Sequence, residues 1–98
     1  MSGARIEVEP IHLRLRAPIH TAHGPLHERE GLIVHARADG LEGLGEVAIL
    51  PGFGAESLAQ ALDRLRTIQL HTIELADLEG WQGFPATRAA LEVALLDL

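Results

Sequence analysis

Two histidines three residues apart are the first candidates in this sequence for metal chemistry. His20 and His23 form a His-x-x-His pattern, which on one face of a helix can bind zinc. They lie instead between Pro18 and Gly24, residues typical of a loop, and no third ligand is evident. We interpret both as surface histidines.

Alternating carboxylates offer a second chemistry, because two neighbouring carboxyl groups can act as general acid and general base. Glu28 and Glu30 flank Arg29, and Glu7 and Glu9 alternate along the first apolar segment. Charges that alternate in this way are more typical of the solvent-exposed face of a strand. We favour that interpretation for both pairs.

Four further features receive structural interpretations. We expect Glu46, which enters a loop, to accept hydrogen bonds from backbone amides. Asp97 has apolar neighbours, and we expect it to pair with a group outside this chain. Trp81 lies between glycines and is expected to pack against adjacent helices rather than bind a ligand. Gly43-Leu44-Gly45 lacks the third glycine and the following helix of a nucleotide-binding loop.

Composition narrows the function further. All eight basic residues are arginines, so the chain contains no lysine to serve as a base or to bind phosphate. Cysteine is absent, which excludes disulfides and thiolate metal sites, and the net charge of −6 argues against nucleic-acid binding. No secretory signal is visible, and no apolar run approaches the roughly 20 residues of a membrane span. We expect a cytoplasmic protein with no membrane partner.

The elements that would position these residues are predicted from hydrophobic periodicity. Residues 5–16 form one long strand bent at Pro10, residues 17–28 form a loop, and strands follow over 31–38 and 44–48. Short connections between consecutive strands indicate a three-stranded antiparallel meander. The predicted fold class is therefore α+β, with helices after the meander.

Two helices are predicted in the second half of the chain. One covers residues 56–70 and the other runs from Pro85 to residue 98, with an irregular stretch over 71–85. The last helix is apolar around most of its circumference and has no polar residues or glycine after it. We therefore expect residues 1–98 to be one domain, truncated in its last helix, whose missing neighbour covers that helix.

Three stretches of the sequence form an ordered set. They are Thr21-Ala22-His23-Gly24 with residues 28–34, the segment 43–57, and the helix 85–98. Together they resemble the N-terminal capping domain of the enolase superfamily, in the mandelate racemase and muconate-lactonizing branch. Gly45-Glu46 followed by Leu50-Pro51-Gly52-Phe53 is most similar to the o-succinylbenzoate synthases of menaquinone biosynthesis. Dipeptide epimerases and N-acylamino acid racemases share parts of this pattern.

The resemblance implies a cap on a (β/α)-barrel that follows residue 98 and is absent from this chain. The barrel would hold the catalytic lysines and the carboxylates that bind Mg²⁺, so this chain has no catalytic residue and no metal ligand of its own. The parent enzyme would remove a proton next to a substrate carboxylate and then lose water, as a carbon–oxygen lyase. The implied partners are a small-molecule carboxylate substrate and the barrel, and a homo-oligomer stays open.

By the same resemblance, two loops of the cap face the substrate. Leu50 and Phe53 would form apolar walls, while Thr21 or His23 would supply hydrogen bonds. The alternative is that Phe53 only anchors its own loop. The complete set of expected substrate-facing residues is Thr21, Ala22, His23, Gly24, Leu50, Pro51, Gly52, Phe53 and Gly54.

Three functions therefore remain. The first is the specificity cap of an o-succinylbenzoate synthase-like, Mg²⁺-dependent dehydratase that is inactive without its barrel. The second is the cap of a related isomerase: a dipeptide epimerase, an N-acylamino acid racemase or a muconate cycloisomerase. The third is a non-enzymatic binding or oligomerisation module.

Overall fold

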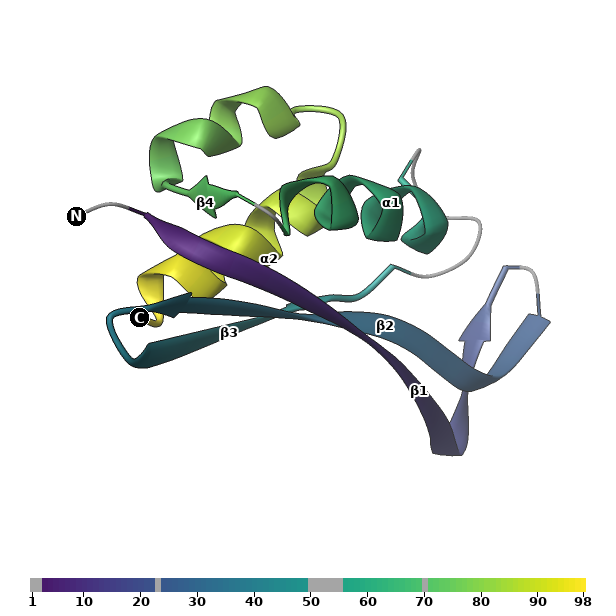
Figure 1. Ribbon diagram of the computed structural model, residues 1–98. Coiled ribbons are helices and arrows are strands. Elements are labelled where there is room, and N and C mark those ends of the chain that lie inside the picture. The colour runs from purple at the N-terminus through teal and green to yellow at the C-terminus, as the bar shows by residue number, and fades with distance from the viewer. Residues whose placement is uncertain (1–2, 23, 50–55, 70) are drawn as a thin grey trace.

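The computed structural model describes residues 3–22, 24–49, 56–69 and 71–98. Within them lies a four-stranded antiparallel sheet of order β3-β2-β1-β4, and the helices cover one of its faces (Figure 1). The strands are β1 (Ala4–Thr21), β2 (Gly24–Ala38), β3 (Leu41–Val47) and β4 (Thr72–Ile73). The helices are α1 (Leu58–Ile68), the 3₁₀ helix η1 (Leu75–Trp81) and α2 (Pro85–Leu96).

The α+β class and the β1-β2-β3 meander are confirmed. Asp39 and Gly40 have φ values of 51° and 77°, as a two-residue hairpin turn requires. The sheet has one strand more than predicted. This strand, the two-residue β4, lies inside the stretch 71–85 that was predicted to be irregular, and it pairs with Ala4 and Arg5 of β1. Helix α1 begins at Leu58 because Ser57 and Gln60 form a reciprocal capping box.

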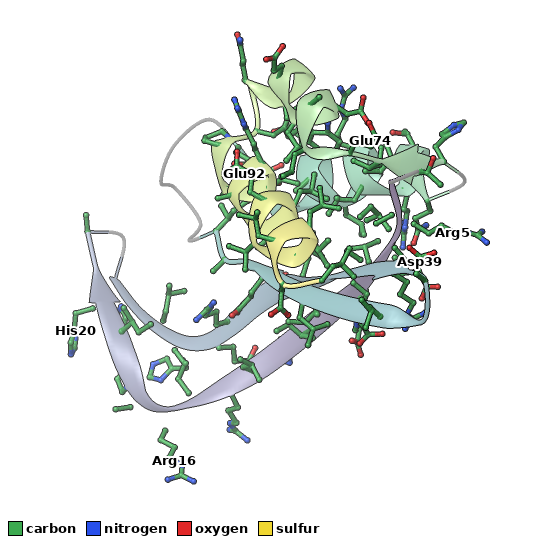
Figure 2. The ribbon with its side chains drawn as sticks, turned by 90° about the vertical axis from the view of Figure 1, so that its left-hand side faces the viewer. Arg5, Arg16, His20, Asp39, Glu74 and Glu92 are labelled. Atoms are coloured by element: carbon green, nitrogen blue, oxygen red, sulfur yellow. The ribbon has the colours of Figure 1, made fainter. Side chains whose placement is uncertain are left out.

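The predicted loop over residues 17–28 is wrong, since β1 and β2 remain paired out to Thr21 and Gly24. Pro18 falls within a register shift between Arg14 and Ile19, where a residue without an N–H is tolerated. The outer half of this hairpin, residues 11–22 and 24–31, is called the arm below. The arm bends toward the side of the sheet that carries the helices, and His20 lies near its free end (Figures 1 and 2).

The core fills the space between the inner half of the sheet and the helices. Trp81 is 3 % exposed, makes an edge-to-face contact with Phe84 at 5.9 Å, and has the Arg64 guanidinium 4.8 Å from its ring centre. Its predicted packing role is confirmed. The other buried apolar residues are Ala4, Ile6, Leu32, Val34, Ala36, Val47, Ala61, Leu65, Ile73, Leu78, Ala90, Leu91 and Ala94.

Helix α2 rests directly on the backbone of β3. A Cβ added at Gly45 would overlap the Ala90 carbonyl oxygen, and one at Gly43 would overlap that of Ala94. Only glycine permits so close an approach of helix and strand. The two glycines of the Gly-x-Gly pattern are therefore packing positions.

The same contact corrects one prediction about the final helix, and the other stays a prediction. Ala90, Leu91 and Ala94 are buried against this chain's own sheet, whereas Val93 and Leu96 are exposed, so a neighbour expected over this helix would cover its outer face. The carboxylate of Asp97 accepts a hydrogen bond of 3.0 Å from the Leu44 N–H, not from a group outside the chain. Leu44 lies on the edge strand of the sheet, where that N–H is open to a side-chain acceptor.

Ion pairs cover the opposite face of the sheet. Arg37 contacts Glu7 and Glu42 at 2.7 Å each, and His35 contacts Glu9 at 3.0 Å and Glu42 at 3.4 Å. The prediction that Glu7 and Glu9 belong to a solvent-exposed face is confirmed. Hydrogen bonds from Arg37, and then from His35, lower the pKa of the Glu42 carboxyl below its usual value.

Replacing Gly45 by valine should destabilise the protein, because the side chain would push α2 away from β3. Overpacking of this kind costs about 2 kcal/mol. Urea unfolding followed by circular dichroism measures the change. Gly80→Ala is the matched control, since a Cβ at Gly80 meets no atom within 4 Å, and an equal loss in both variants would contradict the close-packing argument.

The Glu42 ion pairs should make stability depend on pH. Because the pKa of Glu42 is lowered in the folded protein, its contribution is present above the ordinary value of 4.5 and is lost as pH falls through the folded pKa. Wild type should therefore exceed Glu42→Gln in unfolding free energy at neutral pH and converge with it in acid. Glu79→Gln, at an exposed residue of η1 with no ion pair among the described residues, should show no such convergence.

Candidate functional site

An open groove lies between the arm and the N-terminal end of α1. It consists of two adjoining hollows of about 380 Å³ each, which share His12, Glu30 and Leu58. The first is completed by Pro25, Leu26, His27, Glu28, Arg29 and Ile49, and the second by Pro10, Ile11, Gly31, Leu32, Ala59 and Leu62. A concave surface with apolar walls and a few polar groups is the usual form of a small-molecule site.

The groove begins where the helix-facing side of the hairpin changes from apolar to polar. Val8 pairs with Val34, and Pro10 pairs with Leu32. The next residues on that face are His12, opposite Glu30, and Arg14, opposite Glu28. The arm therefore extends beyond the apolar core, and its inner surface is free to contact something other than this chain's helices.

A polar contact at the groove joins two side chains of the arm itself. His12 Nε2 lies 3.1 Å from Glu28 Oε2, with both side chains more than half exposed. Glu28 and Glu30 are exposed as predicted, but they line the groove instead of the opposite face. Among the described residues, no group of three or more His, Cys, Asp or Glu side chains is placed to hold a metal ion.

The predicted substrate-facing residues fall only partly within the described structure. Thr21 ends β1 opposite Gly24, whose φ is 109°, and Ala22 is exposed in the turn between them. His23 and the segment 50–54 lie outside the described residues.

The chain neighbours of both predicted stretches nevertheless meet in one place. Pro25 and Leu26 follow Gly24, Ile49 precedes residue 50, and all three line the first hollow. Residues 25–26 and residue 49, which are far apart in the sequence, thus line the same hollow.

Glu46 has a different partner from the one predicted. Its Oε1 accepts a hydrogen bond of 2.6 Å from Arg29 Nη2, across the two neighbouring strands, and both side chains are partly exposed. The Glu46 carboxylate therefore meets a side chain of the neighbouring strand β2.

Glu56 has the role that was predicted for Glu46, that of a carboxylate which accepts hydrogen bonds from backbone amides. It was not among the candidates from the sequence. Its side chain is buried and accepts hydrogen bonds from the Ala86 N–H at 2.8 Å, the Thr87 N–H at 3.0 Å and the Thr87 hydroxyl. These are the first amides of α2, whereas we had assigned Glu56 to the start of α1. A signal was present, because the residue before Pro85 is Phe84, which has no side-chain acceptor to cap the helix.

No helix among the described residues is long and apolar enough to cross a membrane. The helices in that part of the chain are α1, η1 and α2. The longest of them, α2, has 12 residues.

Comparison with known proteins places this architecture. The o-succinylbenzoate synthase of Enterobacter sp. (strain 638) is 53% identical over 36 residues, which cover 37% of this chain and 11% of that protein. The solved dipeptide epimerase from Methylococcus capsulatus is 34% identical over 97% of this chain and 30% of that one, with a TM-score of 0.74. The solved o-succinylbenzoate synthase from Thermosynechococcus elongatus BP-1 is 28% identical over 74% of this chain and 23% of that one, with a TM-score of 0.65.

The chain thus spans about a tenth of the curated relative and less than a third of the two solved structures. The family model for "MenC, N-terminal domain" matches residues 10–98, which is nearly the whole sequence. The chain belongs to the MenC N-terminal domain family, an N-terminal capping domain of the enolase superfamily.

Proposed function

We propose that this chain is the substrate-specificity cap of an o-succinylbenzoate synthase-like enzyme of menaquinone biosynthesis. The proposal rests on one observation: in a MenC N-terminal domain, the chain neighbours of both predicted substrate-facing stretches line a single groove. The 53% identity to the Enterobacter o-succinylbenzoate synthase supports the choice of reaction.

Under this proposal, catalysis belongs to a barrel domain that is not part of this chain. This chain contains no lysine, and its described residues include no cluster able to hold a metal ion. The solved Thermosynechococcus relative is complexed with Mg in its active site, which supports a Mg²⁺-dependent parent enzyme. When bound, Mg²⁺ would stabilise negative charge that develops next to the substrate carboxylate.

The cap contributes binding and exclusion of water. Thr21–Gly24 and the segment 50–54 surround the part of the substrate distant from the reacting carbon, with Leu50 and Phe53 as apolar walls. An apolar enclosure strengthens the electrostatic interactions at the reacting centre and limits side reactions with water. Selectivity for the distal group follows from the shape and polarity of these walls.

A second candidate function is the cap of a dipeptide epimerase. It is favoured by the Methylococcus structure, which matches over 97% of this chain at 34% identity, against 74% at 28% for the Thermosynechococcus synthase. In this case the same groove would face the side chain of the substrate's terminal residue. The two candidates share the cap and the barrel, and differ in the distal group that the cap accepts.

Assays of the full-length protein decide between them. The substrate of o-succinylbenzoate synthases is a cyclohexadiene carboxylate that loses water. We expect its Mg²⁺-dependent conversion to o-succinylbenzoate, with activity lost on treatment with EDTA and restored by Mg²⁺. Racemisation or epimerisation of dipeptides without any dehydration would instead establish the second candidate. Absence of activity on both substrate classes would contradict the proposal.

Phe53→Ala tests whether the segment 50–54 contacts substrate. Loss of an apolar wall should lower kcat/KM about 10-fold or more, while kcat for the reaction itself changes less. Leu75→Ala removes an exposed apolar side chain on η1, outside the groove, and should leave both kinetic constants unchanged. If Phe53→Ala also has no effect, that side chain only anchors its own loop.

A further inference from the structure

We infer that Glu56 is a positioning residue that sets the separation of the two cap-side walls of the groove, Ile49 and Leu58. The inference rests on the proposed function, because it concerns how the cap selects its substrate. Glu56 touches neither the groove nor a reacting group among the described residues. It acts through α2.

The Glu56 carboxylate is buried against the N-terminal end of α2. Glu56 is 9% exposed and Thr87 is fully buried. One oxygen of Glu56 accepts from the Ala86 N–H, and the other accepts from the Thr87 N–H and hydroxyl. A buried carboxylate is tolerated only when its oxygens are satisfied in this way. Three donors from one helix end therefore fix the position of residue 56.

The N-terminus of α2 carries free amides and the positive end of the helix dipole, and its own N-cap residue, Phe84, provides no side-chain acceptor. Glu56 supplies that cap from a position 30 residues earlier in the chain. Removing the carboxylate would leave the Ala86 and Thr87 N–H groups without an acceptor, which costs more free energy than an ordinary hydrogen bond contributes.

Helix α2 is seated on β3 through Gly43 and Gly45, and Ile49 lies two residues beyond the end of β3. Leu58 lies two residues beyond Glu56 and begins α1. Helix α2 therefore positions both walls. It positions Ile49 through its contact with β3, and Leu58 through its hydrogen bonds with Glu56. Their separation also sets the distance between the ends of the chain segment that joins them.

A carboxylate is needed because glutamine cannot replace it. Gln has a single acceptor oxygen, and its amide group would present N–H donors to the N–H donors of α2. Glu56→Gln therefore loses at least one of the three hydrogen bonds while keeping the size of the side chain. Thr87→Val removes the hydroxyl from the opposite side of the same contact, and Thr87→Ser keeps it.

The test measures substrate selectivity in the full-length enzyme. Selectivity is the ratio of kcat/KM values for the cyclohexadiene carboxylate and an N-acylamino acid, or for two dipeptides with different side chains if the protein is an epimerase. We expect Glu56→Gln to change this ratio at least about 10-fold, chiefly through KM. Thr87→Val should change it in the same direction, and Thr87→Ser should leave it near the wild-type value.

Ile73→Val is the control for general stability. Ile73 is 7% exposed in the core and does not line the groove. The loss of one buried methyl group should lower the thermal unfolding temperature without changing the selectivity ratio. If Glu56→Gln is too unstable to assay, Thr87→Val carries the test alone.

The outcomes separate the two proposals. An unchanged ratio in both Glu56→Gln and Thr87→Val, with lowered unfolding temperatures, would make the contact purely structural and overturn this inference. If the ratio changes equally in Ile73→Val, selectivity follows general stability and the inference is again overturned. Failure of the proposed function would appear differently, as a wild-type enzyme without activity on either substrate class.

Discussion

The close contact between α2 and β3 is the constraint on which the rest of the structure depends. Gly43 and Gly45 remove two side chains from the strand, so the helix backbone lies against the strand backbone. The buried side chains of α2 then reach the core formed by β2 and η1. Because any side chain at these two positions would separate the layers, the spacing between helices and sheet follows from two residues.

Carboxylates hold both ends of that helix, and their electrostatic situations differ. Glu56 meets the N-terminal amides, where the helix dipole favours a negative charge. Asp97 stands at the C-terminal end, where the dipole opposes it, and is compensated by the Leu44 N–H of the sheet edge. The first interaction joins α2 to the start of α1, and the second joins it to β3. Helix α2 is therefore the reference to which the other elements are fixed.

The parts of the fold that depend on local periodicity were predictable, and the parts that depend on distant partners were not. Alternation identified the meander, and three- and four-residue spacing identified α1 and α2. Pro18 and Gly24 indicated a loop because, in isolation, they disrupt a strand, but pairing that resumes at Ile19 beyond the register shift keeps the two strands together. Glu56 and Asp97 were misassigned because their partners lie far away in sequence, at separations of 30 and 53 residues.

The change of polarity along β1 and β2 separates the core from the groove within one hairpin. As far as Val8 and Leu32 the helix-facing residues are apolar and pack in the core, whereas Pro10, His12, Glu28 and Glu30 line the groove. Substitutions at residues 11–20 and 25–30 therefore cost little core burial, since these residues are already exposed or half-buried. A cap built in this way can change its groove while keeping its frame. Under the proposed function, one frame of this kind would serve both a dipeptide epimerase, which shares the fold at 34% identity, and an o-succinylbenzoate synthase, which shares it at 28%.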